Sequence, residues 1–289
     1  MRVHHGAQIS CNENRPVNYI ILPTWKSCIK KCADTEDCAV AHTISGNPSK
    51  CYTCSISKLG TIRKTSDQKN QIALKTDATN KHDCDSFENG TFFGTFNSFN
   101  NLTQYQYTTT KTKSGWSFEY NIKKFCPPNW QKFKRSRGEW CIQVSSGSYN
   151  QSAAIAKCQE SGATLTALET NEEKMYIWEN ASRLISDNLS QIWIDGQRRE
   201  KCHVTGTPKA FPPGCEWIKG FDFMDKVFNN DNYKYVWEQS NPDCLYDSKT
   251  QTYQDCLAMW IRPNDGLIDD VFCADPPYMF GYACGKLAG

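Results

Sequence analysis

The spacing of apolar and polar positions predicts two helices in different parts of the chain. Cys28 and Cys32 are four residues apart, so a helix would carry both on one face and could be tied to a sheet. Thr24 is a suitable N-cap for that helix. A second helix begins at the capping box Thr170-Asn-Glu-Glu173. Its apolar side chains recur at helical spacing and predict a buried stripe, made of Met175, Trp178, Ala181, Leu184 and Ile185.

Short apolar runs near the start of the chain predict strands. Residues 39–43 and 50–56 flank a turn at Gly46-Asn-Pro48. His42 lies on the first of these runs. We expect a structural histidine there, with its hydrogen bonds satisfied, rather than a metal ligand.

Residues 86–122 have a different composition, because Asn, Thr, Phe and Tyr dominate and cysteine is absent. Polar, Thr-rich composition is typical of a linker. The recurring aromatic residues indicate that part of this segment packs on a neighbour: Phe92, Phe93, Phe96, Phe99, Tyr105 and Tyr107. We therefore expect a partly ordered connector between one domain at residues 1–85 and another at 123–289.

Length and charge narrow the class of protein. A chain of 289 residues suggests two domains. With 33 basic and 31 acidic residues, it lacks the basic footprint of a protein that binds nucleic acid or an anionic membrane. The longest basic cluster, Lys132 to Arg137, is expected to be a solvated turn. No segment approaches the roughly 20 apolar residues of a transmembrane helix.

Sixteen cysteines indicate structural disulfides and a secretory route. A zinc site at Cys51 and Cys54 would need a second such pair, and a redox role would need a βαβ context. Neither is present in the sequence. Five glycosylation sequons agree with secretion, at Asn89, Asn101, Asn150, Asn180 and Asn188. Residues 1–14 contain no apolar run, so no signal peptide is visible, and we expect that the leader is missing from this sequence.

The pattern Trp25-Lys-Ser-Cys28-Ile-Lys-Lys-Cys32, followed by Cys38 and Cys51-Tyr-Thr-Cys54, resembles the PAN/apple module, particularly the PAN-like variety of nematode secreted proteins. The resemblance covers about a quarter of the chain. It implies a bond between Cys32 and Cys38, one from Cys28 to Cys51 or Cys54, and one between Cys11 and Cys84.

The last 165 or so residues resemble a long-form C-type lectin-like domain. Residues 126–133 and 139–142 look like its opening hairpin, residues 152–165 like its first helix and the following turn, and Gln191-Ile-Trp193-Ile-Asp-Gly196 like its core strand. The fold class is therefore α+β, with two helices, antiparallel sheets and a long loop region. The resemblance implies three disulfides, Cys126–Cys141, Cys158–Cys284 and Cys256–Cys273.

Four cysteines have no partner among the pairs that the two resemblances imply. Cys202 and Cys215 bracket a segment rich in proline, and we pair them with each other. Cys244 is then left over in the second domain, as is one of Cys51 and Cys54 in the first. Two odd cysteines predict a bridge between the domains or an intermolecular bond.

Oxygen-bearing side chains gather between Trp237 and Cys273, in the number that a Ca²⁺ site needs. In sugar-binding members of the family, a Glu-Pro-Asn or Gln-Pro-Asp triplet, a later Glu and a Trp-Asn-Asp triplet hold one Ca²⁺, which binds two sugar hydroxyls. Asn241-Pro242-Asp243, Gln254 and Ile268-Asp269-Asp270 match these motifs. The implied metal ligands are Asn241, Asp243, Gln254, Asp269 and Asp270.

None of the three matches is complete. Asn241 is one methylene shorter than the usual residue, Gln254 lacks a charge, and Asp269 carries a charge where Asn is usual. The carboxylate count is still three, as in the family. Ile268 stands where a tryptophan normally packs beneath the loop. The implied sugar contacts are Asn241, Asp243, Gln254 and Asp269, with Tyr246 as the ring that stacks on a sugar face.

The sequence thus predicts a secreted recognition protein with calcium-dependent carbohydrate binding. The partners would be glycans or glycoproteins, and the nematode resemblance suggests innate immune surveillance of microbial surfaces. The alternative is a lectin-like scaffold with a degenerate site that recognises protein without calcium. The loop at 237–273 would then be an ordinary acidic surface loop. None of the five histidines lies in a recognisable catalytic or metal motif, so we expect no enzyme.

Overall fold

The computed structural model describes residues 1–289 except 6, 12–18, 44–48, 68, 78–90, 205–210, 230, 232 and 275–276. The chain divides into two compact units, one formed by Met1–Phe125 with Gly289 and one by Cys126–Ala288. Within the described residues, no helix has both the length and the apolar character needed to cross a membrane. Cys84 and Asn89, which were assigned a disulfide and a sequon, lie outside the described residues.

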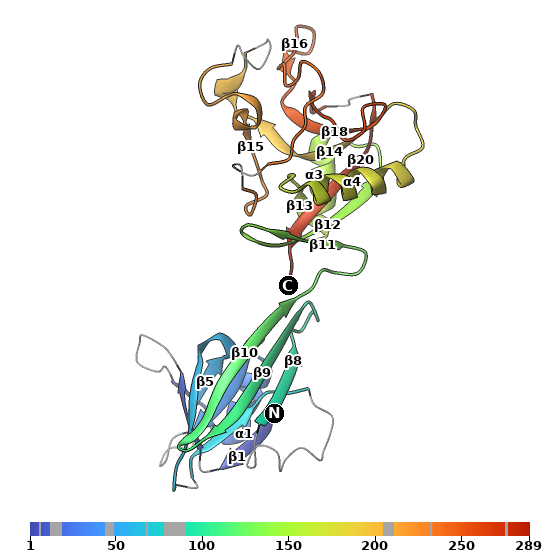
Figure 1. Ribbon diagram of the computed structural model, residues 1–289. Helices are drawn as coiled ribbons and strands as arrows, with labels where there is room; N and C mark the ends of the chain where they lie inside the picture. Colours follow the sequence, from blue (N-terminus) through green and yellow to red (C-terminus); the bar gives the residue numbers. More distant parts are fainter. Residues whose placement is uncertain are drawn as a thin grey trace. The chain divides into compact units, whose positions relative to one another are not determined.

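The first unit contains two five-stranded sheets and helix α1 (Figure 1). One sheet has the strand order β1 (Arg2–His5), β7 (Gln71–Leu74), β4 (Cys38–Thr43), β5 (Lys50–Ser55) and β3 (Tyr19–Ile21). The other has the order β2 (Ala7–Cys11), β6 (Leu59–Lys64), β10 (Gly115–Lys124), β9 (Thr103–Thr112) and β8 (Thr91–Asn97). A short 3₁₀ helix, Ile56–Lys58, joins β5 to β6.

The segment expected to be a connector instead supplies strands β8, β9 and β10 to the second sheet. Phe92 and Phe96 on β8 and Tyr105 and Tyr107 on β9 are buried in one core with Ile62 and residues of the first sheet. They recur at every second or fourth position, which is the period of a strand with one buried face. Phe93 and Phe99 are exposed, contrary to the expected packing. The Thr-rich composition obscured this strand pattern.

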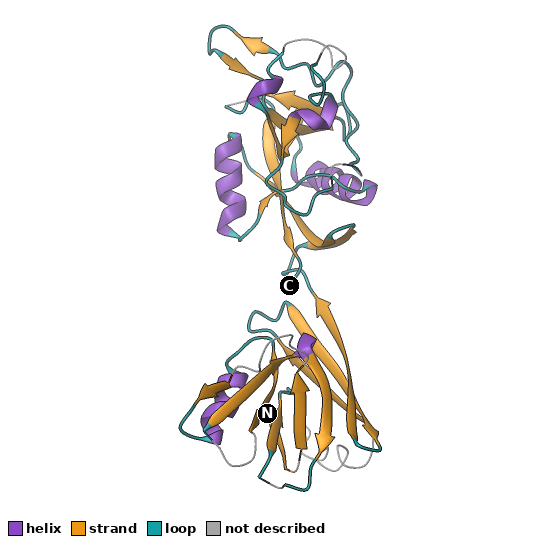
Figure 2. Cartoon of the chain, turned by 90° about the vertical axis from the view of Figure 1, so that its left-hand side faces the viewer, coloured by secondary structure: helices purple, strands orange, loops and turns teal. Residues whose placement is uncertain are grey.

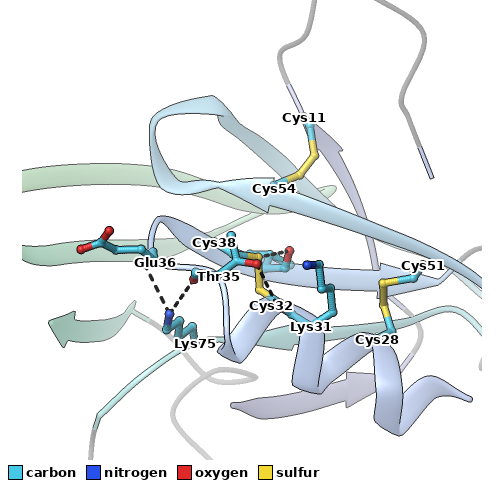
Figure 3. The surroundings of a disulfide bond; sticks show 11 residues. Cys11, Cys28, Lys31, Cys32, Thr35, Glu36, Cys38, Cys51, Cys54 and Lys75 are labelled. Carbon is cyan, nitrogen blue, oxygen red and sulfur yellow. Dashed lines mark hydrogen bonds between the residues drawn. A yellow bond between two sulfur atoms is a disulfide. The ribbon is translucent and has the colours of Figure 1, made fainter. Parts of the chain in front are cut away.

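Helix α1 (Trp25–Ala33) begins as expected, because the Thr24 side chain accepts a hydrogen bond from the Ser27 N–H. Cys28 and Cys32 on its buried face are bonded to Cys51 and Cys38 (Figure 3). Both pairings agree with those that the resemblance implies. The helix is thereby fastened to β4 and β5 at two points.

The expected bond between Cys11 and Cys84 is corrected, because Cys11 on β2 is bonded to Cys54 on β5 (Figure 3). The bridge links one sheet of the first unit to the other, a juxtaposition that sequence spacing does not reveal. Cys51 and Cys54 are thus both bonded within this unit. The expectation that one of them reaches Cys244 is therefore wrong.

His42 lies on β4, and its side chain is buried against the Tyr52 ring at 4.9 Å between centroids. Neither of its ring nitrogens has a hydrogen-bond partner among the described residues. Burial lowers the pKa of His42 to about 4, so the imidazole is neutral at pH 7. The expectation that its hydrogen bonds are satisfied is therefore wrong for the described residues, and its structural role stays a prediction.

The second unit is built on one large sheet. Its main path is β11 (Gln131–Arg135), β12 (Gly138–Ser146), β20 (Met279–Leu287), β14 (Ser190–Arg198), β18 (Cys256–Arg262) and β19 (Ile268–Val271). The short strands β13 (Thr164–Leu165) and β15 (Phe221–Asp222) pair with β20 and β14, and β16 (Tyr246–Asp247) pairs with β17 (Thr252–Tyr253) as a separate hairpin. Two 3₁₀ helices span Glu200–Cys202 and Trp217–Gly220.

Helices α3 (Gln151–Glu160) and α4 (Asn171–Leu184) cover opposite faces of this sheet (Figure 2). On β14, Ile192 and Ile194 pack in the same core as α4, whereas Trp193 packs in the core that contains α3 residues. Because successive strand side chains point to opposite faces, the run Ile-Trp-Ile contributes side chains to both cores. The expected α+β fold, the opening hairpin, the first helix and the core strand are all confirmed.

The capping box at the start of α4 is confirmed, but its apolar stripe is partly wrong. Glu173, Ile177 and Ala181 form the buried face, and Met175 and Leu184 are exposed. Glu173 is buried because its carboxylate pairs with Arg135, with Oε1 2.7 Å from Nε. A stripe chosen only from apolar residues omits this polar member.

Candidate functional site

The expected ligands Asn241 and Asp243 lie on a proline loop, residues 238–245. The Asn241–Pro242 peptide bond is cis, which agrees with the geometry of the family's triplet. However, the Asn241 amide donates a hydrogen bond to Glu238 Oε2 at 2.9 Å. The Asp243 carboxylate accepts one from the backbone N–H of Leu245 at 3.1 Å. Both side chains are therefore engaged within the loop.

Asp270 on β19 holds the proline loop through hydrogen bonds to the loop backbone. Its Oδ1 accepts a hydrogen bond from the Asp243 N–H at 3.0 Å, and its Oδ2 accepts one from the Cys244 N–H at 2.8 Å. The Arg198 guanidinium, at the end of β14, forms an ion pair with the same Oδ2. Both charged side chains have an exposed fraction of 0%. Burial raises the pKa of the Asp270 carboxyl, and the guanidinium and the two N–H groups oppose that rise.

Arg198 makes three further contacts that fix its position. Its Nε donates to the Gln254 carbonyl oxygen at 3.2 Å. The guanidinium lies 4.5 Å from the Phe221 ring centroid and 5.4 Å from that of Phe211, which are cation–π distances. One buried side chain thus joins β14, β19 and the segment that carries Gln254.

Asp269, the neighbour of Asp270 on β19, has different surroundings. Its Oδ2 accepts hydrogen bonds from Gln191 Nε2 and Trp260 Nε1, each at 3.2 Å. Adjacent residues on a strand point to opposite faces, so the two carboxylates cannot share every contact. Burial, followed by the negative charge of Asp270 and then by Glu238 and Asp243, raises the pKa of Asp269 to about 7.

A cavity of about 530 Å³ opens at Asp269, and we call it the Asp269 cavity. This volume lies in the usual range of small-molecule sites, about 300–1,000 Å³. Aromatic rings from four elements or loops line it, belonging to Tyr253, Trp260, Phe272 and Tyr278. Gln191, Gln254, Asp247 and Asp255 supply polar groups. Of the predicted ligands, Gln254 and Asp269 are thus brought together at this cavity.

The five predicted ligands do not fit a single Ca²⁺ ion. Asp270 already carries an internal cation, Arg198, and a second positive charge beside that guanidinium would be repelled in a site shielded from water. Asn241 and Asp243 are held within the proline loop, whereas Asp269 and Gln254 face the cavity. Ca²⁺ needs six to eight oxygens converging on one point, and this arrangement divides them.

Tyr246, the predicted stacking ring, packs on Tyr253 with 4.7 Å between centroids and is not among the residues that line the cavity. Sequence reasoning missed Arg198, Gln191, Trp260 and Tyr278. Arg198 is the last residue of a strand that is buried almost throughout, and a charged residue in that position is a signal for a buried ion pair. Gln191 and Trp260 pair across β14 and β18, a register that the sequence does not supply.

The other disulfides of this unit agree with the sequence analysis. Cys126–Cys141, Cys158–Cys284, Cys256–Cys273 and Cys202–Cys215 all form. Cys244 is buried beside the Cys202–Cys215 pair, and burial raises the pKa of its thiol to about 11. Among the predicted sequons, Asn101, Asn150 and Asn188 are exposed and Asn180 is half-buried, so their glycosylation stays a prediction.

Comparison with known proteins gives the family. Residues 126–287 match the model of the C-type lectin domain-containing protein 141/158, and residues 1–76 match that of the PAN-like domain. No curated protein matches the chain. Similar solved structures include a calcium-independent type II antifreeze protein, with 20% identity, 57% of this chain and 95% of that chain covered and a TM-score of 0.38. The cow CD23 carbohydrate-recognition domain has 19% identity, with 57% and 97% covered and a TM-score of 0.38. The herring type II antifreeze protein has 22% identity, with 56% and 98% covered and a TM-score of 0.38. The family match covers more than half of the chain, which therefore belongs to the C-type lectin domain-containing protein 141/158 family and carries a PAN-like domain before its lectin domain.

Proposed function

We propose that this chain is an extracellular recognition protein whose lectin domain binds carbohydrate in the Asp269 cavity without calcium. The observation that carries the proposal is the buried ion pair between Arg198 and Asp270. In calcium-dependent members of the family, the metal both fastens the proline loop and binds the sugar. Here these two tasks fall to different groups.

Arg198 supports the first task. Its guanidinium joins Asp270, the Gln254 carbonyl and the Phe221 ring, so it holds together the segments that a metal ion would otherwise connect. A guanidinium is permanently protonated, so this connection does not depend on the calcium concentration. Because the side chain has no exposed surface, it cannot bind a sugar hydroxyl in addition.

The Asp269 cavity supports the second task. Aromatic rings such as Trp260 and Tyr278 offer apolar faces for the C–H groups of a sugar. The carboxylate of Asp269 accepts hydrogen bonds from hydroxyls, and the amides of Gln191 and Gln254 can both donate and accept. A mostly apolar cavity with a few convergent polar groups is the usual form of a small-ligand site.

The cysteine chemistry supports an extracellular setting. Seven disulfides join described cysteines of the chain, and such bonds persist in oxidising compartments. C-type lectin and PAN-like domains are typically binding folds without catalysis, so recognition is the role that we propose. Surveillance of microbial surfaces remains a prediction that comes from the resemblance.

A glycan array with purified, disulfide-intact protein tests the proposal. Parallel arrays contain either about 5 mM CaCl₂, which exceeds the dissociation constants of weak extracellular calcium sites, or a chelator. We expect the same glycans to bind in both, and binding to fall at least about tenfold in Trp260→Ala, which removes a wall of the cavity. Trp217→Ala, at an exposed tryptophan outside the cavity lining, serves as the control. Binding that disappears in chelator would contradict the proposal, and binding to no glycan would favour calcium-independent protein recognition.

A further inference from the structure

The charge on the walls of the Asp269 cavity restricts its ligand. Three carboxylates line the cavity, those of Asp247, Asp255 and Asp269, whereas no lysine or arginine is present among its described lining residues. Asp255 is paired with His203, whose Nε2 lies 2.9 Å from Oδ1. Asp247 accepts hydrogen bonds from the Lys249 N–H and the Thr250 hydroxyl within its own turn. Each of these two carboxylates therefore has a local partner.

Asp269 differs from both, because no described lysine, arginine or histidine forms an ion pair with it. The hydrogen bonds from Gln191 and Trp260 both end on Oδ2. Among the described residues, no donor reaches Oδ1. Asp269 lines the cavity, so this partly buried carboxylate still has one oxygen that can accept a hydrogen bond from a ligand.

Aromatic rings stand around this carboxylate. Trp260, which donates to Asp269, has its ring centroid 5.9 Å from that of Tyr278, with 38° between the planes. Tyr253 and Phe272 also line the cavity. Aromatic faces attract cations through their quadrupole, and the attraction grows when the cation is removed from water. A carboxylate beside several aromatic faces is therefore suited to a positively charged group.

We propose that the Asp269 cavity selects a sugar that carries a protonated amine, a hexosamine without its N-acetyl group, and that Asp269 binds the ammonium group. This inference rests on the proposed carbohydrate function and names its substrate class. An N-acetyl group removes the positive charge and adds bulk, so the acetylated sugar loses the ion pair with Asp269. A sugar acid would be repelled by the three carboxylates of the lining.

Calorimetric titration of the glucosamine disaccharide and of its N,N′-diacetyl form tests the inference. We expect the free amine to bind at least about tenfold more tightly, both in chelator and in calcium. Asp269→Asn keeps the shape and the acceptor oxygen for Trp260 but removes the charge, so it should abolish the difference between the two sugars. Asp222→Asn, at a side chain with 77% exposure, is the matched control and should preserve it.

The possible results separate the two proposals. Equal affinity for both sugars would overturn the ammonium inference and leave carbohydrate binding intact. Binding that requires calcium would overturn the proposed calcium independence instead. If neither sugar binds under any condition, both proposals fail.

Choline, whose positive charge is permanent, serves as a second probe of the Asp269 carboxylate. It should bind the unaltered protein at least about tenfold more tightly than it binds Asp269→Asn, and equal affinity for the two proteins would contradict the inference.

Discussion

Asp269 and Asp270 are neighbours on one strand, yet their two carboxylates have different partners. Asp270 has a guanidinium and two backbone N–H groups, with no exposed surface on its side chain. Asp269 has two neutral donors and an open cavity, and its pKa rises to about 7. The comparison teaches that a motif of consecutive acids is not a ligand set until the partner of each acid is known. We infer that Asp270 supports structure and Asp269 supports binding.

The largest expected effect comes from removing the partner of Asp270. Arg198→Ala leaves a buried carboxylate without its cation, which should lower the free energy of unfolding by about 3–5 kcal/mol. Urea denaturation measures this loss. Replacing Asp270 by Asn in the same variant should recover part of it, because the uncompensated charge is then gone.

The control for this prediction is Arg183→Ala on α4. The Arg183 side chain is 73% exposed and lies 3.8 Å from Glu179, so its loss should change the free energy of unfolding by less than about 0.5 kcal/mol. Equal effects of the Arg198 and Arg183 variants would show that the buried pair does not hold the proline loop.

Asp269→Asn should raise the free energy of unfolding, by an amount that depends on pH. The folded-state pKa of Asp269 is about 7, against an ordinary value of 3.8. Folding therefore favours the protonated form, and stability is lost as pH rises from about 4 to about 7. The Asn variant lacks this loss, so it should be more stable than the unaltered protein by about 1–3 kcal/mol at pH 8 and equal to it near pH 4. Thermal unfolding across this pH range measures the difference, and a difference that is constant with pH would contradict the assignment.

Trp260→Phe should have a smaller effect on the free energy of unfolding. It removes the indole N–H that donates to Asp269 and retains most of the ring. The expected loss in the free energy of unfolding is about 0.5–1.5 kcal/mol. The pKa of Asp269 should rise further, which nuclear magnetic resonance of the labelled carboxyl measures. Trp178→Phe is the matched control, because its indole N–H donates to the Ile261 carbonyl at 3.3 Å and does not contact Asp269. An equal change of the Asp269 pKa in both variants would contradict the role of Trp260.

Tyr246→Ala should have the smallest effect. Its ring leans on Tyr253 outside the cavity lining and is 42% exposed. We expect carbohydrate affinity to stay within about twofold, which is below 0.5 kcal/mol. Tyr253→Ala removes a lining ring and should weaken binding more. If Tyr246→Ala abolished binding, the stacking role first predicted for Tyr246 would stand and the cavity would not be the sugar site.

Much of the lectin fold could be predicted from the sequence, because its signals are local. The capping box at Thr170, the helix that carries Cys158 and the apolar run around Trp193 each depend on a few consecutive residues. The strands at 91–124 were missed because Thr and Asn alternate there with aromatic residues. This composition is typical of a linker, and it was given more weight than the strand-like spacing of the aromatic residues. The Cys11–Cys54 bond was missed because it joins two sheets whose packing is not encoded locally.

The site could be predicted only in part. The residues of the loop were identified, and the cis bond at Asn241 agrees with the family's triplet. The partner of Asp270 could not be found, because Arg198 is 72 residues away in sequence and reaches Asp270 through the sheet. A ligand set depends on such distant contacts, and here a single arginine changes its chemistry.

The most direct test of the central claim is thermal unfolding of the unaltered, disulfide-intact protein in calcium and in chelator. If Arg198 supplies the cation of the loop, the transition midpoint of the lectin domain should be the same within about 1 °C in both conditions. A functional calcium site would stabilise the folded state by about 2.7 kcal/mol at a hundredfold excess over its dissociation constant, which corresponds to a rise of about 5 °C or more. Such a rise, lost in Asp270→Asn, would show that calcium binds at Asp270 and would contradict the account.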